Sequence, residues 1–415
     1  MEGTLMGPLW GRGFRLLYGS MSVSAFAHTF GTFIISWFVY EITGSELAMG
    51  GLWLISIGTR MLVQFAVGPY IDRFRRTRVM VFSESIRVTA FLGLLVLAGL
   101  GELTPAALYI GAFLISVVFF DAAAQALLPK LVTEKALVKA NARVAGFVQI
   151  MRLLALPLAG VFVAAWGSAA ALACVTVLFL ISAVMAGKIQ EDVREREKGE
   201  TGSWWSQFKR GVVIYRKHPV LLFLGFFIAV INFAVFATQV MYIPYVVEVL
   251  GGSSFAYGLF AAMFPLGYVA GSYIVGGFRE PARAMMYALM IGALFAGGLT
   301  HIGLGLVTVL WAALLIEAAA GLVMPVWNVY SNLLYQKLVP DRIRGQVFTV
   351  RFLIATAATP LGVVYGTFWA TRFDLPSLFI SVGVLSCVLT LVGLCTLAVY
   401  YGRRRDSVTE IKKIS

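Results

Sequence analysis

Glu317 is the residue of this sequence whose surroundings most clearly suggest chemistry. At least eighteen uncharged residues flank it on either side, so a helix through this stretch carries the carboxyl group into an apolar environment. A carboxylate in such a place needs a cationic partner or a proton. Because a carboxyl group that gains and loses a proton can couple proton movement to another process, Glu317 is a candidate proton-coupling residue.

Three further titratable residues, Asp121, Glu84 and His28, also lie in apolar stretches and are candidates for the same role. Asp121 shares a helix face with Gln125 at spacing i, i+4, and it is either a protonation site or part of a gate. Glu84 precedes Arg87 by three residues, a spacing that allows a structural ion pair as well as a proton site. His28 titrates near neutral pH, and it is either a proton relay or a hydrogen-bonded helix residue.

Other polar side chains in the apolar stretches are expected to line an interior cavity, because a charged group that faces lipid is costly. They are Arg60, Gln64, Arg87, Gln125, Gln149, Arg152, Asn232, Gln239 and Asn328. Arg351 is expected either to reach the membrane surface or to hold a gate. If aromatic residues such as Phe26, Phe30 and Phe33 line the same cavity, a hydrophobic or aromatic substrate fits it better than a sugar.

Several kinds of catalytic or cofactor site find no support in the sequence. It contains no GxxxxGK[ST], GxSxG or HExxH pattern, so neither an ATP-driven pump nor a hydrolase is indicated. Cys174, Cys387 and Cys395 have no metal-like spacing, and three His residues are too few and too scattered for a metal site. We expect no cofactor and no metal.

The elements that must position these residues are membrane-spanning helices. Of 415 residues 60% are hydrophobic, and the mean hydropathy is +0.87, far above that of soluble proteins. Dividing the apolar tract at its Gly, Pro and charge clusters predicts an all-α membrane protein with twelve transmembrane helices. The predicted spans are 14–40, 47–67, 79–101, 105–127, 143–165, 169–188, 219–249, 254–277, 284–303, 305–327, 344–370 and 376–401.

The basic residues predict the orientation of these spans. All but five of the 33 Lys and Arg residues fall in the two termini, in alternate connections or at the span ends next to them, and the other connections between spans 1 and 10 lack them. By the positive-inside rule both termini are cytoplasmic, in the inner or plasma membrane. The net charge of +13 therefore reflects topology in a lipid bilayer, and because the basic residues are spread along one membrane face, nucleic-acid binding is not indicated.

The segment 189–202 is the one long polar stretch, and it separates six predicted spans from six others. Short matches at an offset of about half the chain, such as "KLVTEK" at 130–135 and "KLVPDR" at 337–342, indicate that the two halves are repeats. We predict an N-terminal six-helix bundle at 1–188, a linker at 189–218 with an amphipathic surface helix, a C-terminal bundle at 219–402, and a tail at 403–415.

The stretch "GPYIDRFRRTR", residues 68–78, resembles the signature Gly-x-x-x-Asp-Arg-x-Gly-Arg-Arg/Lys of the major facilitator superfamily. Gly68, Asp72, Arg73 and Arg76 match it, while Arg75 replaces its second Gly. The resemblance implies two pseudo-symmetric six-helix bundles around a central cavity that opens to each side in turn. It also implies that the four matching residues form a cytoplasmic gate or latch, to which we add Arg351 as a gate candidate.

Within the superfamily, "PLAG" at 157–160 and "LVTEKALVKAN" at 131–141 look like the drug:proton antiporter-3 group, which includes macrolide and siderophore exporters. The leading hypothesis is a monomeric secondary transporter that exports a hydrophobic or amphipathic small molecule in exchange for protons. One alternative is a lipid or lysolipid flippase of the same fold. A membrane receptor or scaffold that transports nothing is a further alternative, although the sequence has neither the large soluble domains nor the long loops that would favour it.

Overall fold

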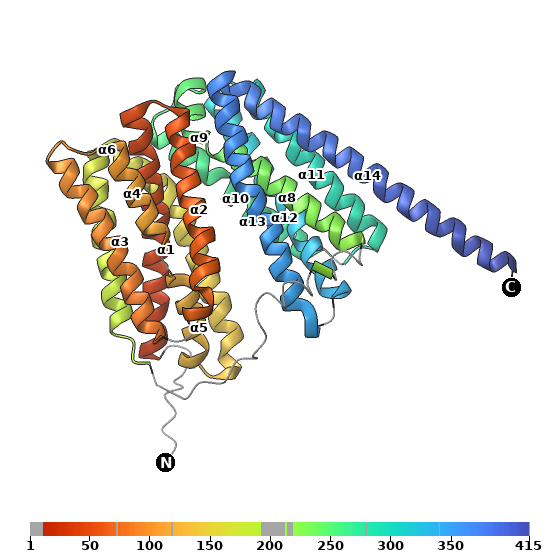
Figure 1. Cartoon of the computed structure of the whole chain (residues 1–415), viewed down its shortest axis with the longest axis horizontal. Helices are drawn as coiled ribbons and strands as arrows, with labels where there is room; N and C mark the ends of the chain where they lie inside the picture. The colour runs from red at the N-terminus through yellow and green to blue at the C-terminus, as the bar shows by residue number, and fades with distance from the viewer. Residues whose placement is uncertain are drawn as a thin grey trace, which may run out of the picture. The chain divides into compact units, whose positions relative to one another are not determined.

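The computed structural model of the chain describes residues 11–71, 74–117, 119–191, 212–213, 219–278, 280–339 and 341–414, and every regular element in these ranges is a helix (Figure 1). The first half contains α1 (Arg12–Thr43), α2 (Glu46–Ile71), α3 (Arg76–Gly99), α4 (Pro105–Ser116), α5 (Phe120–Leu131) and α6 (Glu134–Gly187). The second half contains α8 (Pro219–Gln239), α9 (Tyr242–Pro244), the π-helix η1 (Tyr245–Val249), α10 (Ser254–Gly277), α11 (Arg283–Leu306), α12 (Leu310–Leu338), α13 (Asp341–Arg372) and α14 (Leu375–Ile414).

Eleven segments of the described residues are long and apolar enough to cross a membrane. The longest of them, 49 residues from Lys139 to Gly187, is interrupted at Gly167, whose φ of 81° no helix allows. Both ends of α6 lie at the end of the bundle where α1 begins, so the chain reverses at this kink (Figure 1). Counted as two spans, α6 brings the total to the twelve predicted, and the all-α membrane fold is confirmed.

The fourth predicted span, 105–127, differs from the prediction because it is not one continuous helix. α4 ends at Ser116 and α5 begins at Phe120, with Val117 and Phe119 in non-helical conformations between them. The break leaves backbone polar groups without helical partners inside an apolar stretch. A break of this kind is tolerated at membrane depth only where protein or water satisfies those groups.

Two spans of the second half also differ from their predicted bounds. The predicted helix 219–249 ends at Gln239, and α9 and η1 continue it in distorted form. The predicted helix 305–327 begins at Leu310 and continues to Leu338, so Asn328 lies within α12 and not after its end. α14 runs through the predicted tail as far as Ile414. Of the predicted linker 189–218, only 189–191 and 212–213 are among the described residues.

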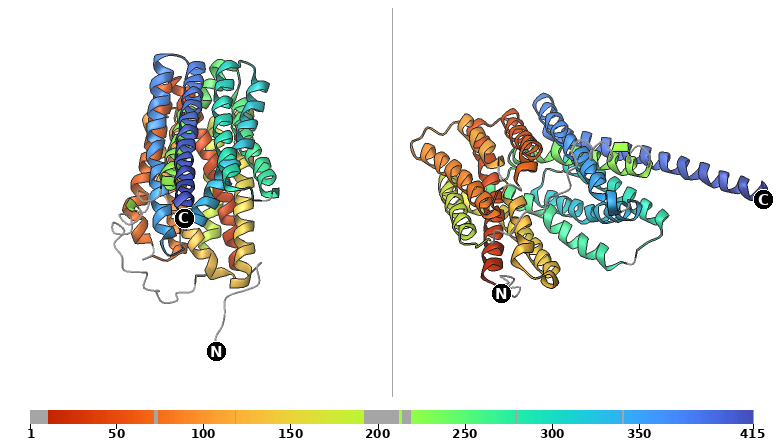
Figure 2. Two further views of the ribbon diagram at one scale, coloured as in Figure 1. Left: turned by 90° about the vertical axis from the view of Figure 1, so that its right-hand side faces the viewer. Right: turned by 60° about the horizontal axis from the view of Figure 1, so that its bottom comes forward.

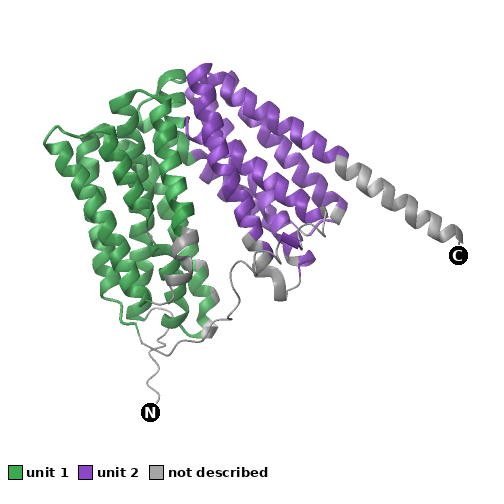
Figure 3. Cartoon of the chain, viewed as in Figure 1, with its two compact units in different colours: residues 1–200, 242–262 green, residues 201–241, 263–415 purple. Residues whose placement is uncertain are grey.

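The chain forms two compact units, residues 1–200 with 242–262 and residues 201–241 with 263–415 (Figure 3). Within each unit the long helices run alongside one another (Figure 2). In unit 1, α1 packs against α6 and α3 also packs on α6, while in unit 2 α11 packs against α14 and α8 against α13. The separation into a first and a second half at the linker stays a prediction.

Residues 242–262 belong to unit 1, although the sequence repeat assigns them to the second half. The Tyr40 hydroxyl donates a hydrogen bond to Glu248 Oε1 at 2.7 Å, and the Ser254 hydroxyl donates to the Gly160 carbonyl at 3.2 Å. α10 also approaches α6 at backbone distance, since a Cβ on Gly160 would lie 2.5 Å from the Ser254 carbonyl oxygen and one on Gly258 would lie 2.6 Å from that of Leu156.

Candidate functional site

Unit 1 carries a set of exposed polar side chains in the interior of its membrane spans. We call these residues the polar face: Arg60 on α2, Asp121 and Gln125 on α5, and Gln149 and Arg152 on α6. All five were predicted to act in transport or to line a cavity. They come from α2 and from the two consecutive helices α5 and α6, and the fold supplies each of them with an accessible position.

The position of the polar face is costly if it contacts lipid. A charged side chain at the middle of a membrane span costs about 2.5–3.5 kcal/mol on insertion scales. Arg60 lies about 21 Å along α2 from Glu46 and about 17 Å from Ile71, at a rise of about 1.5 Å per residue, so it cannot easily reach either end. Charged and amide groups at this depth are satisfied where they meet water or a polar ligand, which is the environment of a substrate pathway.

Asp121 and Arg152 form the ion pair of the polar face. Arg152 Nη2 lies 3.8 Å from Asp121 Oδ2, and 44% of the Arg152 side chain and 62% of the Asp121 side chain are exposed. Asp121 is in the first turn of α5, just after the break in the fourth span, where the helix dipole favours a negative charge. The break therefore places an accessible carboxylate in the interior of the fourth span, within reach of a cationic partner on α6.

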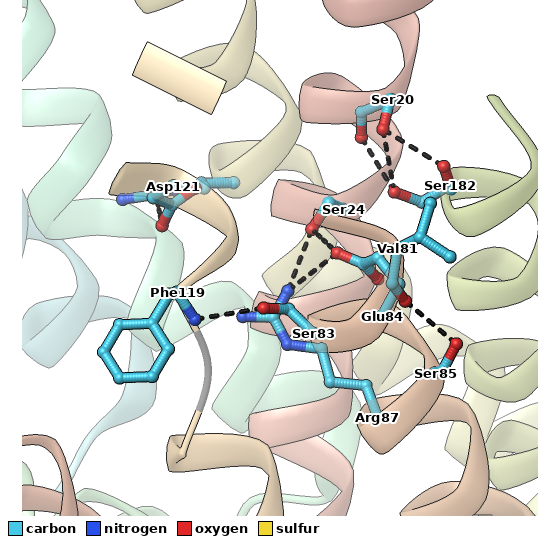
Figure 4. A network of polar contacts seen from close by, with 11 residues as sticks. Ser20, Ser24, Val81, Ser83, Glu84, Ser85, Arg87, Phe119, Asp121 and Ser182 are labelled. Atoms are coloured by element: carbon cyan, nitrogen blue, oxygen red, sulfur yellow. Dashed lines mark hydrogen bonds and ion pairs between the residues drawn. The ribbon is translucent and has the colours of Figure 1, made fainter. Parts of the chain in front are cut away.

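A second polar cluster lies in the core of unit 1, beside the polar face (Figure 4). The Ser24 hydroxyl donates to Glu84 Oε1 at 2.7 Å, and Arg87 Nη1 contacts Glu84 Oε1 and the Ser24 oxygen at 3.0 Å each. Glu84 is fully buried and Arg87 is 5% exposed. Arg87, which was predicted to line the cavity, thus lies in the protein core, where its guanidinium packs between the rings of Phe120 and Phe179.

The core cluster supports the break in the fourth span as well. The Phe119 backbone N–H donates to the Ser83 hydroxyl at 3.1 Å (Figure 4), so α3 satisfies one of the backbone groups that the break exposes. Glu84 Oε2 and Arg87 Nε have no hydrogen-bond partner among the described residues. The cluster is a buried ion pair whose hydrogen bonding is incomplete among the described residues.

His28 on α1 is half-buried and lies four residues, about one helical turn, after Ser24. The charges that act on its imidazole ring are those of Arg87, Arg60 and Arg152. Three guanidinium groups, from α2, α3 and α6, therefore lie near enough to His28 to act on its charge. Glu84 pairs with Arg87 and Asp121 pairs with Arg152.

Aromatic rings connect this region to the rest of α1 and α6. Phe26 contacts Phe30, Phe30 contacts Phe162, and Phe162 contacts Trp166, with ring centroids 5.6, 5.9 and 4.7 Å apart. Phe26, Phe30 and Phe33 were expected to line a cavity, but Phe30 and Phe33 are each 2% exposed, and Phe33 packs on Tyr257 at a centroid distance of 4.8 Å. Trp166 is 65% exposed, so the row reaches the surface at its α6 end.

Unit 2 contains Glu317 on α12, which is 2% exposed. A Cβ on Gly267 of α10 would lie 2.0 Å from the carbonyl oxygen of the next residue, Ala318, and a Cβ on Gly321 would lie 2.1 Å from the Phe264 carbonyl oxygen of α10. Glu317 therefore lies beside a contact of α10 and α12 at backbone distance, which any larger residue would separate.

Arg351 connects α13 to α12 and is 8% exposed. Its guanidinium donates to Asn332 Oδ1 and to the Ser331 hydroxyl and lies 4.5 Å from the centroid of the Tyr335 ring. The other predicted cavity residues of this unit are half-buried. Asn328 donates to the Tyr268 hydroxyl, Asn232 donates to a backbone carbonyl of its own helix, and Gln239 is the last residue of α8.

The predicted latch is described only in part. Gly68 falls within α2 and Arg76 begins α3, while Asp72 and Arg73 lie outside the described residues. Gln64, which was predicted to line the cavity, also falls within α2. Next to the latch, the carboxylate of Glu191 accepts hydrogen bonds from the Thr77 backbone N–H and hydroxyl at 3.0 and 3.1 Å. Sequence reasoning missed Glu191, because its partners are 61 and 114 residues away.

Comparison with known proteins decides the family. The Major Facilitator Superfamily profile matches residues 17–337, more than three quarters of the chain. The chain belongs to the Major Facilitator Superfamily. It is a multi-pass membrane protein and a secondary transporter, and not an enzyme. The similarity that the signature at residues 68–78 indicated is thus confirmed.

Individual relatives of this superfamily member are distant. It is 26% identical over 380 residues to "Uncharacterized MFS-type transporter YvqJ" of Bacillus subtilis (strain 168), covering 88% of this chain and 87% of the relative. It is 21% identical over 392 residues to Macrolide efflux protein A of Streptococcus pyogenes, covering 92% and 95%. The second match agrees with the predicted resemblance to the drug:proton antiporter-3 group.

Solved structures match the fold of this superfamily member over nearly its full length. The nucleoside transporter NupG matches with a TM-score of 0.72 at 12% identity, covering 92% of this chain and 99% of NupG. A bacterial homologue of the iron transporter ferroportin matches with a TM-score of 0.69 at 16% identity, covering 92% and 98%. Identities this low establish the fold and leave the substrate open.

Proposed function

We propose that this transporter exports a hydrophobic or amphipathic small molecule in exchange for protons, with both chain termini on the cytoplasmic side. The observation that carries the proposal is the Asp121–Arg152 ion pair on the polar face. Its carboxylate is accessible in the interior of a membrane span, and its partner is held on a different helix. Distant similarity to a macrolide efflux protein supports the direction of transport and the kind of substrate.

Asp121 is the proposed coupling residue of unit 1. As a carboxylate it attracts Arg152 and holds α5 and α6 together at the break, and as a neutral acid it releases the guanidinium. A proton that binds at Asp121 therefore changes the charge of the polar face and the contact between two helices. A substrate that favours one of the two charge states is coupled to that proton by linkage.

Glu317 is the proposed coupling residue of unit 2. It is almost fully buried beside the contact of α10 and α12, so movement of either helix changes its access to water. Glu84 was a further candidate, but its carboxylate is enclosed with Arg87 and Ser24 in the core of unit 1. We assign Glu84 to the structure of the unit and His28 to the electrostatics of the polar face.

The test uses two amphipathic probes whose charge does not change with pH, the cation ethidium and the anion taurocholate. Purified protein in liposomes is given a pH gradient, with the membrane potential held at zero by potassium and valinomycin. The wild type is expected to accumulate at least one probe against its gradient. Asp121→Asn and Glu317→Gln should lose this accumulation but keep exchange of labelled for unlabelled probe, because exchange needs no net proton movement.

The control is Glu102→Gln, which removes an exposed acid between α3 and α4. It should accumulate the probe as the wild type does. If the double variant Asp121→Asn/Glu317→Gln accumulated the probe at the wild-type rate, the assignment of these two residues to proton coupling would be overturned. A wild type that accumulates neither probe under a pH gradient would overturn the proposed proton coupling.

A further inference from the structure

Arg60 differs from the other charged residues of its region in having no counter-charge. Arg87 pairs with Glu84 and Arg152 pairs with Asp121, but Arg60 has no ion-pair partner among the described residues. Its Nε donates to the Ser56 carbonyl of its own helix at 3.3 Å, an arrangement that leaves the two terminal nitrogens of the guanidinium for another acceptor. The side chain is exposed.

Among the described residues, the three guanidinium groups near His28 and the two carboxylates therefore leave one positive charge, that of Arg60, without an ion-pair partner. The break before α5 adds to the positive character of the region, because the first turn of a helix carries partial positive charge. A guanidinium in the interior of a membrane span, accessible and with no counter-ion in the described part of the chain, suits a ligand with an anionic group. Its planar fork matches the oxygens of a carboxylate, sulfonate or phosphate.

Apolar surface for the rest of such a ligand comes from the half-buried Phe26 and Phe162 and the exposed Trp166, on the same two helices that hold His28 and Arg152. Phe30, which joins them, is 2% exposed and supports the row from within. The ring contacts from Phe26 through Phe30 and Phe162 to Trp166 join α1 to α6 and end at an exposed indole. A molecule with an anionic group at one end and a rigid hydrophobic body fits both features. A cationic amphiphile would instead meet the uncompensated guanidinium and be repelled by it.

We infer that Arg60 binds the anionic group of the transported molecule, so that this chain selects amphipathic anions over amphipathic cations. The inference rests on the proposed function in that the bound molecule is the one carried. An anionic lipid headgroup and a free anionic amphiphile share this chemistry, and the experiment separates them.

The experiment measures equilibrium binding of radiolabelled taurocholate, which carries a sulfonate, to the full-length protein in phosphatidylcholine nanodiscs. Arg60→Gln is expected to weaken binding about tenfold or more, since a lost charge-assisted hydrogen bond costs at least that much. Arg60→Lys keeps the charge but loses the fork, so its loss should be smaller. Added salt should weaken binding in the wild type more than in Arg60→Gln.

Two controls exclude a general effect of removing an arginine. Arg372→Gln removes an exposed arginine from the last turn of α13 in unit 2 and should leave taurocholate binding unchanged. Ethidium should bind the wild type more weakly than taurocholate, and Arg60→Gln should narrow that difference. Arg60→Lys, which keeps the charge and the stem, provides the same comparison if Arg60→Gln is poorly folded.

Nanodiscs in which phosphatidylglycerol replaces part of the phosphatidylcholine identify the source of the anion. If the anionic lipid competes with taurocholate in the wild type but not in Arg60→Gln, the natural ligand is a lipid headgroup. If it does not compete, the ligand is a free amphiphile. Both results support an anion site at Arg60.

The inference is overturned if Arg60→Gln and Arg60→Lys bind taurocholate as tightly as the wild type, or if the wild type binds ethidium in preference. Failure of the proposed function gives a different result. In that case taurocholate binding depends on Arg60 but a pH gradient drives no accumulation. Accumulation of ethidium that is independent of Arg60 would leave the proposed function standing and remove the anion site.

Discussion

Glu191 and Thr77 are joined by two hydrogen bonds, from the Thr77 backbone N–H at 3.0 Å and from its hydroxyl at 3.1 Å, both to Glu191 Oε2. The other carboxylate oxygen lies 3.7 Å from Lys130 Nζ, and Arg75 Nη2 donates to the Glu191 backbone carbonyl at 3.1 Å. Glu191, which follows the end of α6, thus holds the first turn of α3 and the last turn of α5. It connects three helices at the end of unit 1 that carries the predicted latch.

Glu191→Gln should lower the thermal stability of the protein at neutral pH. Burial by itself raises the pKa of Glu191, but hydrogen bonds from Thr77 and from the Arg76 backbone, with the charge of Lys130, outweigh it and lower the pKa below its usual value. A lowered pKa means that the carboxylate stabilises the fold above its unfolded-state pKa and that this stabilisation disappears as the pH falls through the folded-state pKa. Loss of a capping carboxylate costs about 1 kcal/mol.

Unfolding temperatures at pH 7 and near pH 4 provide the measurement. The difference between wild type and Glu191→Gln should be largest at pH 7 and should shrink toward acid pH. Glu102→Gln, at an exposed loop position, should have the unfolding temperature of the wild type at both pH values. If the unfolding temperature of Glu191→Gln fell further below that of the wild type as the pH decreased, the role assigned to the carboxylate would be contradicted.

Glu84→Ala should be strongly destabilising, because it leaves the Arg87 charge buried without its partner. Breaking a buried pair on one side costs about 3–5 kcal/mol, whereas replacing both members by apolar residues is often neutral. The double variant Glu84→Leu/Arg87→Met should therefore unfold at a higher temperature than Glu84→Ala. It should also retain transport, since we assign the pair to structure. Stable double variants that no longer couple transport to protons would instead return Glu84 to the coupling residues.

Ser83→Ala tests the break between α4 and α5. The Ser83 hydroxyl accepts the Phe119 N–H, and without it a buried backbone donor is left unsatisfied at a cost of about 1–3 kcal/mol. Ser85 lies two residues away on the same helix, is exposed, and donates to its own helix at Val81. Ser85→Ala is therefore the matched control and should change the unfolding temperature little. Equal effects of the two substitutions would show that the hydroxyl of Ser83 does not support the break.

Gly160→Ala should weaken the packing of residues 242–262 on α6. The added Cβ would lie 2.5 Å from the Ser254 carbonyl oxygen, so the two helices must separate, and overpacking of this kind costs about 1–3 kcal/mol. Gly146→Ala is the control on the same helix, because nothing lies within 4 Å of its added Cβ. The unfolding temperature of Gly160→Ala should be lower than that of the wild type, and the unfolding temperature of Gly146→Ala should be equal to it or higher. The reverse order would contradict the close approach of α6 and α10.

The number of spans and the family could be predicted from the sequence because hydropathy and charge distribution are properties of the chain alone. The break at Val117–Phe119 could not, since "FLISVVFFDAAAQ" contains no Gly or Pro and reads as an uninterrupted apolar helix up to Asp121. What stabilises the break is a hydroxyl on α3, which is a tertiary contact. The pairing of Asp121 with Arg152 and the exposure of Arg60 likewise depend on how three helices pack.

The roles of individual residues could not be assigned from the sequence where they depend on tertiary contacts. The spacing of Glu84 and Arg87 allowed both an ion pair and a proton site, and the burial of both side chains with Ser24 favours the ion pair. Asp121 and Gln125 shared a face by spacing, but the partner of Asp121 is 31 residues away on α6 and could not be assigned from the sequence. Glu191 gave no signal, because a single acid after a helix is common.

The exchange of substrate for protons at Asp121 is tested most directly by recording proton movement during substrate efflux. Proteoliposomes are loaded with the probe that shows exchange, ethidium or taurocholate, and with the pH indicator pyranine, at equal pH on both sides and with the membrane potential held at zero. As the probe leaves down its gradient, the wild type should acidify the lumen. Asp121→Asn should release the probe with no acidification. Efflux from the wild type without acidification, or acidification by Asp121→Asn at the wild-type rate, would contradict the account.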